Sequence, residues 1–184
     1  MMRTIYYAKT RNVKSPVGNR EDDSGIDFYI PENEGSFVCD LIKKNQTAFD
    51  EHAIIIKDNF IFLTPMACIL IPSGIYVCIP DLDNKEYKIS LDVDNKSGVA
   101  TKKGLTVGAD IIDRAYEGEC HLSLFNSTSK TAALEFGEKI TQCIPRIVAN
   151  NPIQEYEGTP EEMYKACGHE SKRGAGGFGS TGTN

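Results

Sequence analysis

The chain has 184 residues and a formal net charge of −6. This length suffices for one domain with a substantial hydrophobic core, so we expect a single domain. The negative charge argues against a protein that binds duplex nucleic acid through a basic face, and we expect no direct binding of nucleic acid. A small polyanion is not excluded, because one local cluster of basic groups is enough to bind it.

The sequence has no segment typical of a secreted or membrane protein. The first residues, MMRTIYYAKTRN, contain no apolar run long enough for a signal peptide, and no stretch approaches the length of a membrane span. The six cysteines form no C-x-x-C pair and the three histidines form no H-x-x-x-H pair, so we expect no zinc site. We therefore expect reduced thiols, buried or at strand edges, in a cytoplasmic protein.

Short apolar runs, rich in β-branched residues and often alternating, predict an all-β fold. In chain order we expect a strand that begins near Asp27 and then strands over 52–57, 59–63, 67–79, 87–93, 119–125 and 140–148. In the run CHLSLF the alternation places His121 and Leu122 on opposite faces of the strand. Many short strands of this kind are typical of a sandwich, a jelly roll or a barrel.

Three segments do not follow the strand pattern. Residues 32–58 begin polar and irregular, and we expect an inserted hairpin or loop there. The sequence TPEEMYKAC predicts one short helix that begins after Thr159. The end of the chain, KRGAGGFGSTGTN, has the glycine-rich composition of a flexible tail. The same tail contains backbone amides, a guanidinium and an aromatic ring, which are the groups needed to hold a phosphate and a base.

Four further stretches combine glycine with polar side chains. DDSGIDFYIP puts Asp27 after a glycine turn, and DNKSGVATKKGL predicts a turn at Lys96. VGADIIDRAYEGE predicts a hairpin with Asp113 and Tyr116 three positions apart, and GEKITQCIP predicts a turn entering a strand with Gln142. Taken singly, each of these could be an ordinary turn or strand residue, because such residues are common in the turns of any β protein.

Together with the tail, these stretches occur in the order of the five motifs of the homotrimeric dUTPase (deoxyuridine 5′-triphosphate nucleotidohydrolase) family, which the chain resembles from Asp22 to Gly182. RGAGGFGSTG resembles the family's last motif, and GADIIDRAYEGE resembles its form G-A-x-V-I-D-x-x-Y-x-G. KSGVATKKG is similar to the form R-S-G-L-A-x-K-x-G.

The resemblance implies a distorted jelly roll or β-barrel of the dUTPase-like fold, with one short helix, over residues 1–171. Residues 172–184 would form a flexible flap over the active site. The family is a trimer, so the resemblance also implies a C3 homotrimer with active sites at subunit interfaces, each covered by the tail of another subunit.

The activity implied is that of a dUTP diphosphatase, which hydrolyses dUTP to dUMP and pyrophosphate, limits uracil in DNA and supplies dUMP for dTMP synthesis. Asp113 would be the general base that activates the attacking water. Mg²⁺ would be held mainly by the three phosphates, with Asp27 acting through water. The other residues that the resemblance implies in substrate binding are Lys96, Ser97, Gly98, Gly108, Ala109, Asp110, Ile111, Ile112, Tyr116, Gln142, Arg173, Phe178, Gly179, Ser180 and Thr181.

The chain departs from the family pattern at several positions. Lys96 stands where Arg is usual, Asp110 where Gly is commonest, and Ala115 where Asp is frequent. The segment between Asp27 and Ser97 is longer than in compact members of the family. Insertions of this kind are common in viral and phage members, so one interpretation is a phage-type protein of the host cytoplasm.

Two alternative functions remain. A dCTP deaminase would share the fold and resembles the chain around AYEGECHLSLFN, but it needs a catalytic glutamate where this chain has Ser123, and it lacks the flap. A dUTPase-like regulator would bind nucleotide and a protein partner without turnover, and the 32–58 insertion favours it. Asp113, Ser97 and the tail, all intact, argue for activity.

Overall fold

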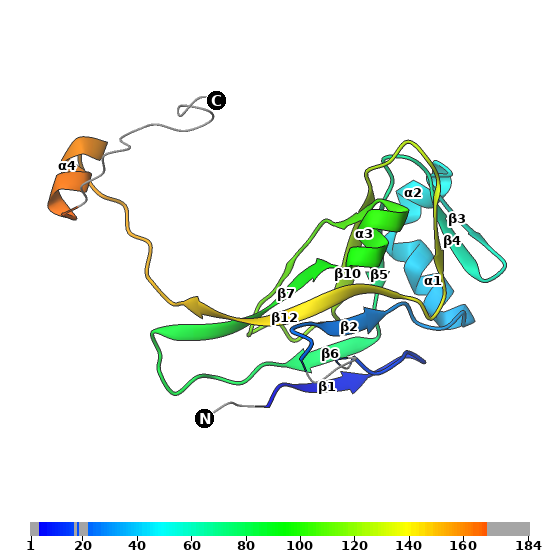
Figure 1. Ribbon diagram of the computed structural model, residues 1–184, viewed down its shortest axis with the longest axis horizontal. Coiled ribbons are helices and arrows are strands. Elements are labelled where there is room, and N and C mark those ends of the chain that lie inside the picture. Colours follow the sequence, from blue (N-terminus) through cyan, green and yellow to red (C-terminus); the bar gives the residue numbers. More distant parts are fainter. Residues whose placement is uncertain (1–3, 17, 19–21, 169–184) are drawn as a thin grey trace. The chain divides into compact units, whose positions relative to one another are not determined.

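The computed structural model describes residues 4–16, 18 and 22–168 of the chain (Figure 1). The chain divides into two compact units, Met1–Asn150 and Asn151–Asn184. The first unit contains the β-sheets, and the described part of the second contains one helix. Across the described ranges, no helix is both long and apolar enough to cross a membrane.

The first unit is built from short antiparallel strands, as the sequence predicts. Its sheets have the strand orders β1-β6, β5-β10-β8, β11-β4-β3 and β2-β12-β7-β9, and they do not close into a barrel. The strands that the structure describes are β1 (Tyr6–Lys9), β2 (Ile26–Tyr29), β3 (Ile54–Lys57), β4 (Phe60–Leu63), β5 (Cys68–Pro72), β6 (Ile75–Cys78), β7 (Tyr87–Asn95), β8 (Leu105–Val107), β9 (Ile111–Ile112), β10 (His121–Asn126), β11 (Ala132–Glu135) and β12 (Lys139–Ala149).

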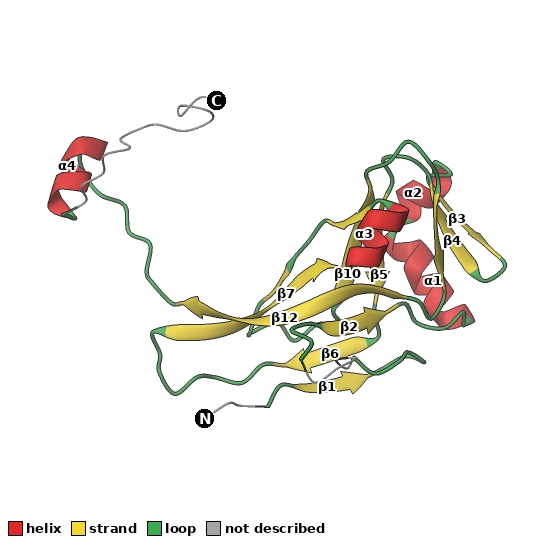
Figure 2. Cartoon of the chain, viewed as in Figure 1, coloured by secondary structure: helices red, strands yellow, loops and turns green. Residues whose placement is uncertain are grey.

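The expectation of a single short helix is only partly right. The predicted helix is α4 (Pro160–Ala166), and Thr159 and Glu162 form the capping box at its start. The described residues also include α1 (Gly35–Lys44), α2 (Gln46–Asp50) and α3 (Ser97–Lys103). Figure 2 shows α1, α2 and α3 in the first unit.

The expectation of an inserted hairpin or loop over residues 32–58 is wrong, because α1 and α2 occupy most of this segment. Helix α1 forms because Phe37 and Leu41 fall one turn apart on the same face, where both are buried. Asn45 follows α1, and its side chain exchanges two hydrogen bonds with the backbone of Leu70, at 2.8 and 2.9 Å. Because β5 is an edge strand, this contact satisfies backbone groups that the sheet leaves unpaired.

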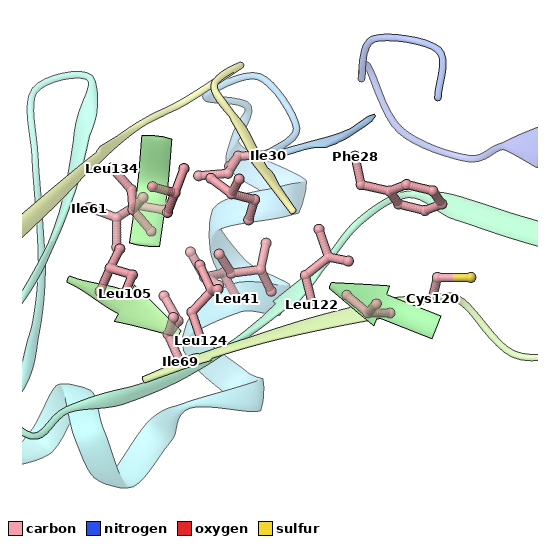
Figure 3. Close-up of a cluster of buried hydrophobic side chains, with 14 of the residues drawn as sticks. Phe28, Ile30, Leu41, Ile61, Ile69, Leu105, Cys120, Leu122, Leu124 and Leu134 are labelled. Carbon is pink, nitrogen blue, oxygen red and sulfur yellow. The ribbon is translucent and has the colours of Figure 1, made fainter. Parts of the chain in front are cut away.

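The hydrophobic core of the first unit lies between the sheets and α1. Strand β10 follows the predicted alternation, so that Leu122 and Leu124 are buried while His121 and Ser123 are only partly covered. Figure 3 shows Leu41 of α1 projecting into the same cluster as Leu122 and Leu124. The segment 32–58 therefore contributes to the core of the unit.

The six thiols differ sharply in exposure, which gives a first testable prediction. Burial raises the pKa of Cys120 to about 11, and it also raises the pKa of Cys143. The remaining cysteines are exposed: Cys39, Cys68, Cys78 and Cys167. Because the thiolate is the reactive form, we expect iodoacetamide to spare Cys120 and Cys143 in the folded protein at about pH 8.

Mass spectrometry of alkylated peptides, with and without denaturant, measures this difference. The unfolded chain is the control, since all six thiols should then react alike. Equal labelling of Cys143 in the folded and unfolded protein would contradict its buried position.

Candidate functional site

The segment that contains Asp113 and Tyr116 runs from one sheet to another. Strand β8 pairs with β10, whereas β9 pairs with β7, so the predicted simple hairpin over 107–119 is wrong. The amide of Gly108 donates to the carbonyl of Ser123 at 3.0 Å, and the carbonyl of Asp110 accepts from the amide of Val93. These bonds hold the stretch 108–112, which includes Ala109, between two sheets. They also occupy the amide of Gly108 and the carbonyl of Asp110 as hydrogen-bonding groups.

A pocket of about 190 Å³ lies at the end of this segment. Its lining residues are Ile111, Ile112, Asp113, Tyr116 and His121. A turn brings Asp113 and Tyr116 to the same place, because the amide of Tyr116 donates to the carbonyl of Asp113 at 3.0 Å. The structure thus joins four of the predicted site residues in one pocket.

His121 is a lining residue that the sequence reasoning did not select. Its Nδ1 lies 2.7 Å from the carbonyl oxygen of Glu119. Because a carbonyl only accepts, Nδ1 must be protonated. The other ring nitrogen, Nε2, is buried and has no hydrogen-bond partner among the described residues. The alternation of β10, which already put His121 on the face opposite Leu122, was the signal that could have identified it.

A second group of predicted site residues lies where β2, β12 and β7 run side by side. Gln142 of β12 is opposite Asp27 of β2 and Asp94 of β7. The amide of the Gln142 side chain donates to the carbonyl of Asn95 at 3.2 Å. Lys96 is the residue after Asn95, and its ammonium group donates to the carboxylate of Asp27. The sheet register therefore brings together Asp27, Lys96 and Gln142, which are far apart in the sequence.

The stretch around Ser97 and Gly98 is not the turn that the sequence analysis expected. It is the first turn of α3, with Lys96 in the extended conformation at the N-cap position. Helix α3 ends at Lys103 and is followed by its C-cap Gly104, which has a φ of 64° in the left-handed region that favours glycine. Ser97 and Gly98 therefore lie beside the Asp27–Lys96 pair.

Asp27 is almost fully buried and its carboxylate is neutralised by two lysines. One oxygen accepts from Lys96, and the other accepts from Lys139 at 3.2 Å. The Lys96 side chain is 26% exposed and the Lys139 side chain 43%, so both cations keep some contact with water. A buried carboxylate needs such partners, because an unpaired buried charge is costly.

This arrangement limits how the chain can hold Mg²⁺. Within the described ranges, no three His, Cys, Asp or Glu side chains come together as a metal cluster. Both oxygens of Asp27 already accept from ammonium groups. The described residues of the single chain therefore fit a Mg²⁺ whose ligands come mainly from phosphates and water better than one held by those residues alone.

Replacing Asp27 by Asn tests the importance of this buried pair for stability. The change leaves two partly buried lysines without a carboxylate, so we expect the free energy of unfolding to fall by about 2 kcal/mol, below the value for a fully buried pair. Urea denaturation measures the difference, with the exposed Asp23→Asn as the matched control. A loss of unfolding free energy equal to that of the control would show that the ion pairs of Asp27 with the two lysines do not stabilise the fold.

The pocket and the group around Lys96 share no residue. The five residues that line the pocket include none of Lys96, Ser97, Gly98 or Gln142. The predicted tail residues, Arg173, Phe178, Gly179, Ser180 and Thr181, lie outside the described part of the chain.

Comparison with known proteins identifies the fold and the family. A protein-family model described as dUTPase matches residues 62–182. The last four motifs lie inside this match, and DDSGIDFYIP lies before it. Of the solved structures, the dUTPase of Staphylococcus bacteriophage 80alpha with dUPNHPP has a TM-score of 0.67 and 18% identity, and the match covers 99% of this chain and 100% of that chain.

Curated relatives agree with the family model. The deoxyuridine 5′-triphosphate nucleotidohydrolase of Candida albicans is 38% identical over 89 residues, which are 48% of this chain and 52% of that protein. The protein of the same description from Wolbachia pipientis is 33% identical over 131 residues, 68% of this chain and 74% of that protein. The chain spans about half the length of the yeast relatives it matches.

Proposed function

Because this chain belongs to the dUTPase family, we propose that it hydrolyses dUTP to dUMP and pyrophosphate. The observation that most supports this activity is the pocket in which the Asp113 carboxylate and the Tyr116 ring lie with Ile111 and Ile112. A carboxylate that can activate water stands there beside an aromatic and aliphatic wall that suits a nucleoside.

In the proposed reaction, Asp113 orients a water molecule and accepts one of its protons. The water oxygen forms a bond to the α-phosphorus while the bond from that phosphorus to the oxygen bridging to the β-phosphate breaks. The electron pair of the broken bond leaves with pyrophosphate. Asp113 is exposed in the single chain, as a base that must meet water and substrate should be.

Selectivity would come from the shape of the same pocket. The Tyr116 ring folds back over Gly118, where an added Cβ would lie 2.4 Å from the tyrosine oxygen. In this position the ring would press against the deoxyribose and leave no room for a 2′-hydroxyl. The backbone of residues 108–114 would read the uracil edge, and a close fit there would exclude the methyl group of thymine.

The phosphates would lie at the group formed by Lys96, Ser97, Gly98 and Gln142. Mg²⁺ would be held mainly by the three phosphates, and when bound it would neutralise phosphate charge. For Asp27 to act through water, a lysine would have to release one of its carboxylate oxygens, because both accept from ammonium groups in the single chain. Lys96 would have to share its ammonium group between Asp27 and the substrate, since it donates to Asp27 in the free chain. Because its ammonium is a point charge rather than a planar fork, its contact with the phosphates would differ in geometry from that of an arginine.

The assembly would be a C3 homotrimer with active sites at the interfaces. The pocket lining in one chain includes none of Lys96, Ser97, Gly98 or Gln142, which supports this proposal, because a neighbouring subunit could then complete the site. Residues 1–171 would form the β domain and residues 172–184 a flap, in which Phe178 stacks on uracil while Arg173, Gly179, Ser180 and Thr181 cover the phosphates. The protein would act in the cytoplasm.

A deaminase of the same fold is the less favoured alternative. Ser123 stands on β10 where such an enzyme needs a glutamate, and a hydroxyl cannot replace a carboxylate in moving protons during deamination. A role as a nucleotide-dependent regulator of a protein partner is favoured only by the α1–α2 insertion.

Turnover of dUTP in ¹⁸O-labelled water tests the proposed reaction. Attack on the α-phosphorus predicts one heavy oxygen in dUMP and none in pyrophosphate, measured by mass spectrometry. Heavy oxygen in pyrophosphate would indicate that water attacks the β-phosphorus. Ammonia released from dCTP would indicate the deaminase.

A further inference from the structure

A partly buried ion-pair network adjoins the pocket through Glu119, outside the residues that the proposed reaction uses. The guanidinium of Arg11 makes a two-pronged contact with the carboxylate of Glu119, with N–O distances of 2.8 and 3.1 Å. Its third nitrogen donates to Asp40 of α1 at 3.0 Å. The side chains of Arg11 and Glu119 are only 16% and 12% exposed, so this is a largely desolvated pair.

Glu119 is fixed on its other side as well. The amide of Gly74 donates to its carboxylate at 2.6 Å. Burial alone would raise the pKa of Glu119, but the bonds from Arg11 and Gly74 outweigh it and hold that pKa below its usual value. Gly74 has a φ of 73°, and a Cβ there would lie 2.7 Å from the Cβ of Arg11. Glycine at this position therefore allows Arg11 to pack against the turn and reach Glu119.

The backbone of Glu119 holds two walls of the pocket. Its carbonyl oxygen accepts from the hydroxyl of Tyr116 at 2.9 Å and from Nδ1 of His121 at 2.7 Å. The next residue, Cys120, is held by backbone bonds to Ile75 and Ser73. A change in the orientation of the Glu119 peptide would therefore move Tyr116 and His121 together.

The network also reaches the inserted helix. Asp40 is on α1, and the guanidinium of Arg11 lies 5.8 Å from the centre of the Phe37 ring, which is buried on the same helix. Helix α1 thus contacts Arg11 through a charge and through an aromatic face. The path from α1 to the pocket consists of these contacts, the Arg11–Glu119 pair and the Glu119 carbonyl.

From these contacts we propose that Arg11 and Glu119 are positioning residues, which hold Tyr116 and His121 for the deoxynucleoside and connect α1 of the insertion to the pocket. The inference rests on the proposed function for its substrate. Neither residue need touch the substrate. Their loss should loosen the ring of Tyr116, and with it the exclusion of a ribonucleotide.

The test compares Arg11→Met, Arg11→Lys, Glu119→Gln and Asp40→Asn in the full chain, using kcat and KM for dUTP and UTP. We expect Arg11→Met and Glu119→Gln to lower the preference for dUTP about tenfold, mainly through KM, because small misplacements at a pocket are costly. Arg11→Lys keeps the charge without the planar fork and should recover part of the preference. The matched control is Lys43→Met, which removes an exposed cation that lies 3.8 Å from the same Asp40.

A second readout needs no turnover. The ¹⁵N spectrum of labelled histidine should show His121 protonated at Nδ1 in the unaltered protein and a mixture of tautomers in Arg11→Met or Glu119→Gln. Should Arg11→Met not fold, Arg11→Lys and Asp40→Asn decide the question, since each removes only part of the network.

Folded variants with unchanged preference and an unchanged His121 tautomer would overturn the inference. If the unaltered protein does not hydrolyse dUTP, the proposed function fails, while the histidine spectrum still decides whether Glu119 positions the pocket.

Discussion

Asp113→Asn should reduce kcat for dUTP hydrolysis by about 10³-fold, because an amide cannot accept the proton of the attacking water. The substitution keeps the size of the side chain, and Asp113 lies in an exposed turn, so the fold and the pocket with Tyr116 should persist. Binding of a non-hydrolysable dUTP analogue should therefore stay within a few-fold of its original value, since the base acts mainly on the transition state.

The measurement combines steady-state kinetics with calorimetric titration of the analogue. Asp58→Asn is the matched control, because Asp58 is an exposed aspartate in the turn between β3 and β4. Its φ of 53° is one that Asn accepts as readily as Asp. Parallel loss of binding and turnover in Asp113→Asn would contradict a role as base and indicate a role in folding or binding. Binding of a protein partner that survives in this variant would favour an additional regulatory role.

Removal of residues 172–184 should lower kcat/KM for dUTP about 10²-fold, because in our proposal these residues form a flap that would exclude water and complete the contacts to the phosphates. The first unit ends at Asn150, so its sheets and core should be unaffected by the truncation. The melting temperature of the truncated chain should accordingly match that of the full chain.

A scrambled tail separates a specific flap from a simple extension. The control keeps the composition and length of residues 172–184 but changes their order, so that Arg173 and Phe178 no longer occupy their positions. We expect this protein to behave like the truncated one. Full activity of the scrambled or truncated chain would contradict the flap and leave the tail as an ordinary flexible end.

The parts of the fold that depend on local pattern could be predicted from the sequence. Strand β10 was predictable because its side chains alternate, and α4 because Thr159, Pro160 and Glu162 are a local start signal. Helix α1 was missed although Phe37 and Leu41 have helical spacing. It begins at a glycine, and Glu34 before it provides no side-chain cap, so no start signal marks it.

The parts that depend on distant pairing could not be predicted. Strands β8 and β9 look like a hairpin in the sequence, but their partners are β10 and β7. The contact between Arg11 and Glu119 joins residues 108 positions apart in the sequence. Neither residue lies in a sequence pattern that predicts its contact with the other. The burial of Asp27 between two lysines likewise follows from the register of β2 and β12.

A competition experiment tests the central claim most directly. An equimolar mixture of dUTP, dCTP, dTTP and UTP is incubated with the full chain and Mg²⁺, and all nucleotides, pyrophosphate and ammonia are measured over time. We expect dUTP to disappear first, with dUMP and pyrophosphate formed in equal amounts and no ammonia. Persistence of dUTP, or ammonia released as dCTP disappears, would contradict it.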